Sequence, residues 1–411
     1  MSEGQLAILG AGPTGIEAAL AAAERGWPFT LYEAGDEVAS HMRDWGHVRL
    51  FSPWSLDVSP RMRRALAAAG RRAPDGETCP TGAELRAEVF VPLAASPALA
   101  PRLRLASEVL AVGRAGLLKH EAIGAPERRG RPFRLLVRDA AGRESVAAAG
   151  AVLDCTGSYS RPNRLGDGGI PAPGEERAAG RIVRRIPDFG REAGEWRGRR
   201  VLLVGAGHSA QTAAVELAAL ASGDATTRVV WALRAASPEW HVDPADPLPE
   251  RSRLTAAARE LAGGSSPAFD VRRGVVVDRF DEAGDGLAVT LRGADGTAST
   301  VTVDRVLGLT GAVGDHAMYR QLQIHECYAT SGPMKLSAAL LAAGGGGGDC
   351  LAQESHGAET LVNPEPDFFI LGAKSYGRNS TFLMRVGWQQ LDEAFALLEA
   401  AQRARATAAP A

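Results

Sequence analysis

The feature that most constrains the fold is an apolar run that passes directly into a glycine-rich turn. Residues 6–15 read Leu-Ala-Ile-Leu-Gly-Ala-Gly-Pro-Thr-Gly, and the alanine-rich residues 16–25 follow. The spacing places Gly10 at a tight turn, Gly12 where a pyrophosphate approaches bare backbone, and Gly15 where a helix packs close to the strand. The phosphates would lie on the N–H groups and the positive dipole end of that helix. The predicted ligand contacts of this turn are Gly10, Gly12, Pro13, Thr14 and Gly15.

A second apolar strand, residues 29–32, ends at Glu33. This acid follows the first glycine at about the 20-residue spacing at which a carboxylate accepts the ribose hydroxyls of a bound adenosine. Strand, helix and acid together predict a dinucleotide site. The alternative is a structural glycine turn in an α/β protein.

The segment from residue 40 to residue 54 is dense in aromatic, imidazole and guanidinium groups. A flat conjugated ring needs apolar faces and a few donors for its heteroatoms, so this segment is a candidate wall for such a ring. The alternative is a packed loop with buried aromatic side chains. Trp45, His47 and Arg49 are predicted to lie near the ring, with His47 and Arg49 as the candidates for a catalytic role.

Two helices, three short strands of a β-meander and a buried strand are predicted before the middle of the chain. They span residues 61–70, 81–95, 103–109, 133–137, 145–148 and 151–155. Thr81, with Glu84 three residues on, is a capping box. The buried strand ends in Thr156-Gly157, and the prolines and glycines between residues 162 and 174 predict a loop that crosses to a second domain.

The opening pattern recurs in the middle of the chain. An apolar run enters Gly205-Ala206-Gly207, and a helix is predicted from there to about residue 220, with Ala210 in the third small position. This is again the strand, turn and helix of a dinucleotide site. For the histidine that opens the helix, the alternative is a helix-start donor only. The predicted contacts of this second site are Gly205, Gly207, His208, Ser209 and Ala210.

The strand after this helix, residues 228–233, ends at Arg234 rather than at an acid. A carboxylate here would repel a 2′-phosphate, whereas an arginine holds it through a bidentate, charge-assisted contact. Arg234 therefore favours NADPH over NADH. The alternative is a solvated charge at the end of a strand.

Further β pairing is predicted over residues 270–303, and the strand 305–309 ends in Thr310-Gly311, which repeats Thr156-Gly157. We expect these two Thr-Gly pairs to mark the seams where the second domain leaves and rejoins the first. Both pairs are also predicted cofactor contacts.

The last third of the chain is predicted to return to the first domain. Residues 334–343 are predicted to form a short helix, and the glycines at 344–348 are predicted to form a flexible loop, because no strand precedes them and no Lys-Ser/Thr pair follows. A core strand at 367–372 then leads to a helix from about residue 382 to 401. A helix start aimed at the ring would stabilise negative charge on it. The predicted contacts here are Gly372 and Asn379.

Composition narrows the function classes. A chain of 411 residues suggests two or three domains. The formal net charge of −2 gives no reason to expect nucleic acid or an anionic membrane as a partner, and no apolar run is long enough to span a bilayer. The N-terminus shows no basic-then-apolar signal sequence. Scattered cysteines without metal-ligand spacing fit a reduced cytoplasmic protein with no metal. They are Cys79, Cys155, Cys327 and Cys350.

With both glycine turns, both Thr-Gly pairs and the terminal strand and helix, the whole chain resembles flavoproteins with two dinucleotide-binding domains. This group contains flavin-containing monooxygenases, Baeyer–Villiger and amine N-hydroxylating enzymes, and thioredoxin-reductase-like proteins. The resemblance implies an α/β fold in which a Rossmann-like FAD domain, residues 1–185 and 305–411, is interrupted by a Rossmann-like NAD(P)H domain, residues 186–304. It assigns the first turn and Glu33 to FAD, and the second turn to NADPH.

The implied function is an FAD-dependent, NADPH-using oxidoreductase, monooxygenase-like, acting on a small molecule with a nucleophilic sulfur or nitrogen. Molecular oxygen would be a co-substrate, and homodimers are common in such proteins. Two alternatives stay open: an NADPH-dependent reductase of a quinone, disulfide or protein, in which Cys327 or Cys350 would act, and a flavin-binding sensor. Residues 186–196 lack the F-x-G-x-x-x-H signature of class B monooxygenases, and the chain lacks the C-x-x-C of reductases.

Overall fold

The computed structural model describes residues 5–240, 246–343 and 355–408. The chain folds into two compact units, one made of Met1–Arg161 with Val313–Ala411 and the other of Pro162–Ala312. The glycine run at 344–348 and Cys350 lie outside the described residues.

The second unit is longer at both ends than the expected segment 186–304, and the backbone pairing explains why. β8 (Ile182–Val183) pairs in parallel with β15 (Arg305–Gly308), so both strands belong to this unit's sheet. The Asn163 N–H donates to the Gly311 carbonyl over 2.9 Å. The unit boundaries therefore follow closely on the two Thr-Gly pairs.

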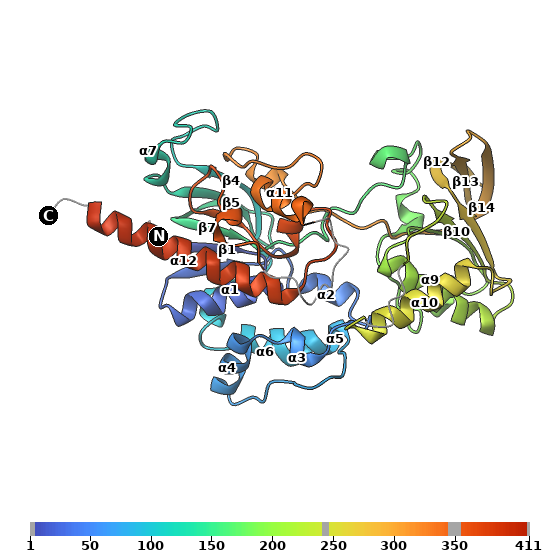
Figure 1. Ribbon diagram of the computed structural model, residues 1–411, viewed down its shortest axis with the longest axis horizontal. Helices are drawn as coiled ribbons and strands as arrows, with labels where there is room; N and C mark the ends of the chain where they lie inside the picture. Colours follow the sequence, from blue (N-terminus) through green and yellow to red (C-terminus); the bar gives the residue numbers. More distant parts are fainter. Residues whose placement is uncertain (1–4, 241–245, 344–354, 409–411) are drawn as a thin grey trace. The chain divides into compact units, whose positions relative to one another are not determined.

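The first unit is built on a five-stranded parallel sheet with the order β16-β7-β1-β2-β3. Its strands are β1 (Leu6–Leu9), β2 (Phe29–Tyr32), β3 (Leu103–Arg104), β7 (Ala151–Asp154) and β16 (Phe368–Ile370). Alternate residues of β1 reach two different cores. Leu6 and Ile8 pack with α1 (Pro13–Glu24) and α12 (Met384–Ala408) on one face (Figure 1). Ala7 and Leu9 pack against the meander on the other face. Burial on both faces is why the strand is a continuous apolar run.

The meander is an antiparallel sheet of β4 (Glu108–Arg114), β5 (Phe133–Arg138) and β6 (Glu144–Ala149). The predicted strand at 103–109 is divided, because Ala106 has a positive φ of 45° and turns the chain between β3 and β4. One part extends the parallel sheet, and the other starts the meander. The shorter helices of this unit are α2 (Ser40–Asp44), α3 (Trp54–Asp57), α4 (Pro60–Ala68), α7 (Pro126–Arg129) and α11 (Met334–Ala342).

The helical stretch predicted at 81–95 forms, but with an irregular middle. The capping box is present, since the Thr81 N–H donates to Glu84 and the Glu84 N–H to the Thr81 hydroxyl. After α5 (Gly82–Leu85), residues Arg86–Phe90 are π-helical before α6 (Val91–Ala94). Pro92 has no N–H to donate to the residue four before it, which accounts for a widened turn at this point.

The second unit repeats the parallel architecture in the order β11-β10-β9-β15-β8. The new strands are β9 (Arg200–Val204), β10 (Arg228–Leu233) and β11 (Phe269–Arg273), and the helices are α8 (Ala193–Trp196), α9 (His208–Gly223) and α10 (Pro249–Ala262). The sequence patterns missed α10. They also merged β11 with the antiparallel strands β12 (Val275–Ala283), β13 (Gly286–Gly293) and β14 (Ala298–Val303), whereas β11 pairs in parallel with β10.

Among the described residues, no helix is both long enough and apolar enough to cross a membrane.

A buried ion pair ties distant parts of the first unit together. The Lys374 ammonium, 0% exposed, lies 2.5 Å from the Asp154 carboxylate at the end of β7. It also donates to the Asp315 carbonyl over 2.6 Å and to the Thr156 hydroxyl over 3.2 Å. One side chain thus fixes the residues after β7, the segment that returns from the second unit and the turn after β16.

Removing this cation should destabilise the protein strongly. Lys374→Met leaves Asp154 buried without a counter-charge, a loss of about 3–5 kcal/mol in the free energy of unfolding. Urea denaturation measures this, with Lys335→Met as the control, because Lys335 is half-exposed and lies 4.0 Å from Glu359. Equal losses in the two variants would show that the buried pair contributes no more than a surface charge.

Candidate functional site

The first glycine turn is shaped by close backbone approaches. Gly10 has a φ of +90°, and a Cβ there would lie 2.8 Å from the Cys155 carbonyl oxygen. A Cβ on Gly15 would lie 1.8 Å from the Gly10 carbonyl oxygen, so α1 packs on the turn only because residue 15 has no side chain. Gly12, the N-cap of α1, has no atom within 4 Å of its Cβ position and no side-chain cap. The helix therefore presents N–H groups to open space, as an anion site requires.

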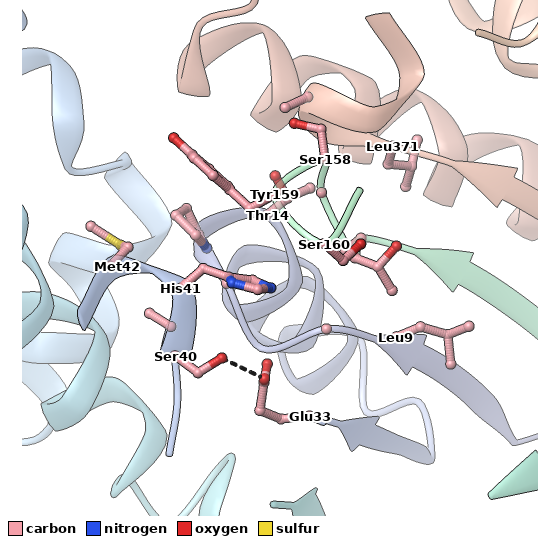
Figure 2. Close-up of a pocket in the computed structure, with 18 of the residues that line it drawn as sticks. Leu9, Thr14, Glu33, Ser40, His41, Met42, Ser158, Tyr159, Ser160 and Leu371 are labelled. Carbon is pink, nitrogen blue, oxygen red and sulfur yellow. Dashed lines mark hydrogen bonds between the residues drawn. The ribbon is translucent and has the colours of Figure 1, made fainter. Parts of the chain in front are cut away.

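Glu33 is held rigidly at the end of β2. One carboxylate oxygen accepts the Ala11 N–H over 2.7 Å, and the other accepts the Gly35 N–H over 2.9 Å and the Ser40 hydroxyl over 3.0 Å (Figure 2). Since each carboxylate oxygen has two acceptor sites, the oxygen that binds Ala11 retains capacity for one further donor, such as a ribose hydroxyl.

A cavity of about 640 Å³ in the first unit connects these two features. It is lined by eight of the residues predicted from the sequence: Gly10, Gly12, Pro13, Thr14, Glu33, Trp45, Thr156 and Gly157. Its lining also includes residues that the sequence reasoning did not single out as contacts, among them Ser40, His41, Asp57, Tyr159, Arg161 and Arg385. His41 and Asp57 belong to or follow closely on the aromatic segment, which was the signal available for them.

Aromatic rings gather at this cavity. The Tyr159 ring lies 6.0 Å from the His41 ring and is stacked 6.2 Å from the Trp45 ring, measured between centroids. Figure 2 shows Tyr159, His41 and Thr14 among the side chains that line the cavity. Tyr159 follows the Thr156-Gly157 pair, so the end of β7 and α2 supply this wall together.

Asp57, the last residue of α3, is a buried carboxyl in the cavity lining. Its side chain is 1% exposed, and the Ser52 hydroxyl donates to Oδ1 over 2.6 Å. Oδ2 has no hydrogen-bond partner among the described residues. Burial raises the pKa of Asp57 to about 7, and the bond from Ser52 opposes this shift. The carboxyl therefore changes its charge near neutral pH.

Five predicted contacts of the first unit are not among the residues that line this cavity. The Arg49 guanidinium is half-exposed and donates to the Cys79 carbonyl, and His47 Nε2 is buried without a partner in the described structure. Gly15 and Gly372 do not line the cavity but pack closely against residues that do. A Cβ on Gly372, for example, would lie 2.5 Å from the Thr14 hydroxyl. The side-chain oxygen Oδ1 of Asn379 accepts the N–H and the hydroxyl of Thr381.

The second glycine turn has the same local geometry as the first. Gly205 has a φ of +131°, and a Cβ there would lie 2.2 Å from the Leu309 carbonyl oxygen. Gly207, the N-cap of α9, has no atom within 4 Å of its Cβ position. His208 and Ser209 are exposed in the first turn of α9, and Ala210 is buried.

Two indoles secure this turn, and neither was predicted. Trp231 Nε1 donates to the Gly205 carbonyl and Trp240 Nε1 to the Ala206 carbonyl, each over 2.9 Å. The two rings stack with centroids 5.2 Å apart. Both turn carbonyls are thus satisfied by side chains, which leaves the N–H groups as the ligand-facing groups.

The remaining predicted contacts of the second unit lie at strand ends. Arg234 is exposed and directly follows β10. The Thr310 carbonyl accepts the Asn163 side-chain amide over 2.9 Å, and Gly311 has a φ of +82°. The Thr310-Gly311 pair therefore shapes the chain where the unit ends.

No protein-family model and no curated protein matches the chain. Solved structures match it over nearly its full length. It is similar to the bacillithiol disulfide reductase Bdr (YpdA) from Bacillus cereus, with a TM-score of 0.69, 16% identity, and 97% of this chain and 99% of that chain covered. It is also similar to the ornithine N-hydroxylase KtzI of Kutzneria sp. 744, with a TM-score of 0.61, 14% identity, and 97% and 99% covered.

Thioredoxin reductase from T. acidophilum gives a TM-score of 0.56 at 14% identity, with 95% of this chain and 97% of that chain covered. At such identities the likeness establishes the fold. The chain therefore has the predicted α/β fold with two Rossmann-like domains, which thioredoxin-reductase-like proteins and flavin monooxygenases share.

Because the pKa of Asp57 is raised, ionisation of this side chain should lower the free energy of unfolding as the pH rises. Asp57→Asn, which cannot ionise, should not show this loss. In the unfolded chain an aspartate ionises near pH 3.9, so the stability that the neutral, buried form contributes is lost as the pH rises from 4 to 7. Between pH 4 and pH 7 the free energy of unfolding of Asp57→Asn should therefore rise, relative to that of the wild type, by up to about 4 kcal/mol. Urea denaturation at several pH values measures the difference, with the exposed Glu144→Gln as the control. A difference that stays constant with pH would contradict the assignment.

Proposed function

We propose that the protein is an FAD-dependent oxidoreductase that uses NADPH. The observation that carries this proposal is the pair of matched glycine turns, one in each unit. In both turns the helix begins at a glycine with open space before it, while the neighbouring glycine is packed against backbone. A structural turn needs the packed glycine only, whereas an open glycine at the N-cap is what a phosphate needs.

The cavity of the first unit fits FAD in its chemistry. The N–H groups at the start of α1 would bind the pyrophosphate, and the free acceptor site of Glu33 would bind a ribose hydroxyl. Trp45, Leu50 and Leu56 supply apolar surface for a ring. Bound FAD would supply a centre that accepts a hydride and passes electrons on. Lys374 holds Thr156 and Asp315, and thereby the rim of the cavity, in place.

NADPH is assigned to the second unit. The N–H groups at Gly207 and the following residues would bind its pyrophosphate, and Arg234 at the end of β10 would bind the 2′-phosphate. His208 and Ser209 are exposed at the helix start.

For the reaction we propose a monooxygenase-like oxidation, by molecular oxygen, of a small molecule with a nucleophilic sulfur or nitrogen. Proteins of this fold include the ornithine N-hydroxylase KtzI and the cadaverine monooxygenase DfoA from Erwinia amylovora, whose structure contains FAD. Trp45, Leu50 and Leu56, half-buried apolar residues of the cavity lining, would help to exclude water from the reacting centre.

A second candidate is an NADPH-dependent reductase of a disulfide or another acceptor. Cys327 favours it, because hydrogen bonds from Thr330 lower the pKa of the Cys327 thiol and so favour the reactive thiolate. Oxygen consumption and NADPH oxidation, measured together with candidate amines, thioethers and disulfides, distinguish the two. Oxygen use that depends on a nucleophilic substrate supports the first candidate, and disulfide-dependent NADPH oxidation without oxygen use supports the second.

We further propose a cytoplasmic protein, supported by the free thiols of Cys155 and Cys327. We also propose that the protein forms a homodimer, which a measurement of the mass of the protein in solution tests.

Replacing each open glycine by alanine should show which glycine turn binds FAD and which binds NADPH. Gly12→Ala and Gly207→Ala both keep an extended N-cap and meet no protein atom, so both variants should fold. Gly12→Ala should lower the affinity for FAD by about 10- to 100-fold, because phosphate contacts to N–H groups are lost, while Gly207→Ala should do the same for NADPH and retain flavin. Visible spectra and calorimetric titrations measure this, with Gly113→Ala as the control. Full flavin content in Gly12→Ala would refute the assignment.

Arg234 should determine the preference between the two nicotinamide cofactors. Arg234→Ala should raise the KM for NADPH by about 10- to 100-fold, since a charge-assisted contact to the 2′-phosphate is lost, and should leave the KM for NADH unchanged. Steady-state kinetics with both cofactors measure this, and the exposed Arg253→Ala serves as the control. Equal effects on both cofactors would place the 2′-phosphate elsewhere.

A further inference from the structure

One aromatic ring in the lining of the first-unit cavity is open to solvent. The Phe, Tyr and Trp residues of this lining, as far as the structure describes it, are Tyr32, Trp45, Tyr159 and Phe382. Tyr32 is buried and two others are half-buried, whereas 59% of the Tyr159 side chain is exposed. An exposed fraction this large means that at least one face of the Tyr159 ring is uncovered. A large, accessible aromatic face in a ligand-sized cavity is a contact surface for another flat ring.

The uncovered ring lies inside the hollow. Tyr159 belongs to the residues that line the cavity, and Figure 2 shows its side chain among them. Desolvation by the surrounding protein raises the pKa of the Tyr159 hydroxyl. A side chain that is both accessible to solvent and crowded by protein atoms lies in a concave part of the surface. The uncovered face of Tyr159 therefore borders the cavity.

Contacts with neighbouring residues position this ring in the absence of a ligand. Its centroid lies 6.0 Å from that of the His41 ring and 6.2 Å from that of the Trp45 ring, and its plane is tilted from theirs by 30° and 27°. Two residues further along the chain, the Arg161 carbonyl accepts the Val313 N–H over 3.0 Å and so anchors the segment. A ring that is already positioned loses little conformational entropy when it stacks on a ligand.

We propose that Tyr159 stacks on the isoalloxazine, the flavin ring system, of bound FAD. This inference rests on the proposed function, in which FAD fills this cavity. Glu33 and the start of α1 account for the ribose and the phosphates, and Figure 2 shows Tyr159 well apart from Glu33. Trp45, whose ring neighbours that of Tyr159, belongs to the apolar surface assigned to the flavin ring. The uncovered face of Tyr159 therefore lies at the flavin end of the cavity.

The first test compares the affinity of the apoprotein for FAD with its affinity for ADP, which lacks the flavin ring. Tyr159→Leu should weaken FAD binding by about 2- to 10-fold, because an aromatic stacking contact is lost, and should leave ADP binding unchanged. Calorimetric titration measures both affinities. Since the Tyr159 side chain is exposed, this variant should fold. Tyr328→Leu is the matched control, because Tyr328 is fully exposed and is not among the residues that line the cavity.

The fluorescence of bound FAD gives a second, independent test. A tyrosine in contact with a photoexcited flavin quenches its emission by transferring an electron, which then returns, whereas phenylalanine is too hard to oxidise to do so. Tyr159→Phe keeps the ring and should therefore lengthen the fluorescence lifetime of bound FAD. The same substitution in a Trp45→Phe background separates this effect from quenching by the neighbouring indole. Tyr328→Phe should leave the lifetime unchanged.

The outcomes separate this inference from the proposed function. If FAD binds, but its fluorescence lifetime is the same with and without Tyr159→Phe in both backgrounds, the role of Tyr159 is refuted and the flavin site stands. If Tyr159→Leu weakens ADP binding as much as FAD binding, the ring contacts the adenosine half of the ligand, and the inference is wrong. If the wild type binds no FAD, the proposed function fails, and this inference falls with it.

Discussion

The close approach of α1 to the first glycine turn is the contact on which the first unit depends. A Cβ on Gly15 would lie 1.8 Å from the Gly10 carbonyl oxygen, and one on Gly10 would lie 2.8 Å from the Cys155 carbonyl oxygen. The turn is therefore wedged between the helix that follows β1 and the end of β7. This wedge brings the ends of β1, β2 and β7 to one edge of the sheet, where Gly12, Glu33 and Thr156 line a single cavity. Ligands of open α/β sheets bind at such an edge.

Buried charges hold the late parts of the chain to this framework. Lys374 joins Asp154 to the Asp315 backbone. Glu365 is buried between Arg114 and Arg128, at 2.6 Å and 2.8 Å, and so links the segment before β16 to the meander. Lys374 and Glu365 are each buried beside a side chain of opposite charge. These pairs therefore hold the segments that they join in fixed positions. Among the described residues Asp57 has no such partner and accepts only the hydrogen bond from Ser52, whereas Glu33, which also has no cation beside it there, accepts three hydrogen bonds.

Much of the candidate site was predictable because its motifs are local. The strand, turn and helix at residues 6–25 and again at 201–220, the acid after β2 and the capping box at Thr81 each depend on neighbours within one element. These short motifs can be recognised in the sequence because the backbone conformation at each position restricts which residue types fit there. The second compact unit, Pro162–Ala312, begins and ends shortly after the two Thr-Gly pairs, which stand at strand ends where the chain changes direction. The helix α10 was missed because its apolar stripe is weak and its start, Pro249, carries no side-chain cap.

The sequence by itself determined the α/β class, the two glycine turns and the acid or base at the end of each second strand, since these follow from backbone sterics and short-range spacing. Only the tertiary structure decided which residues share the cavity. It brings Asp57, Tyr159 and Arg385 together with Gly12, although they are far apart in the chain, and it leaves Arg49 on the Cys79 carbonyl. The physical reason is that burial and the absence of a counter-charge arise from packing between distant segments, and no local pattern records them.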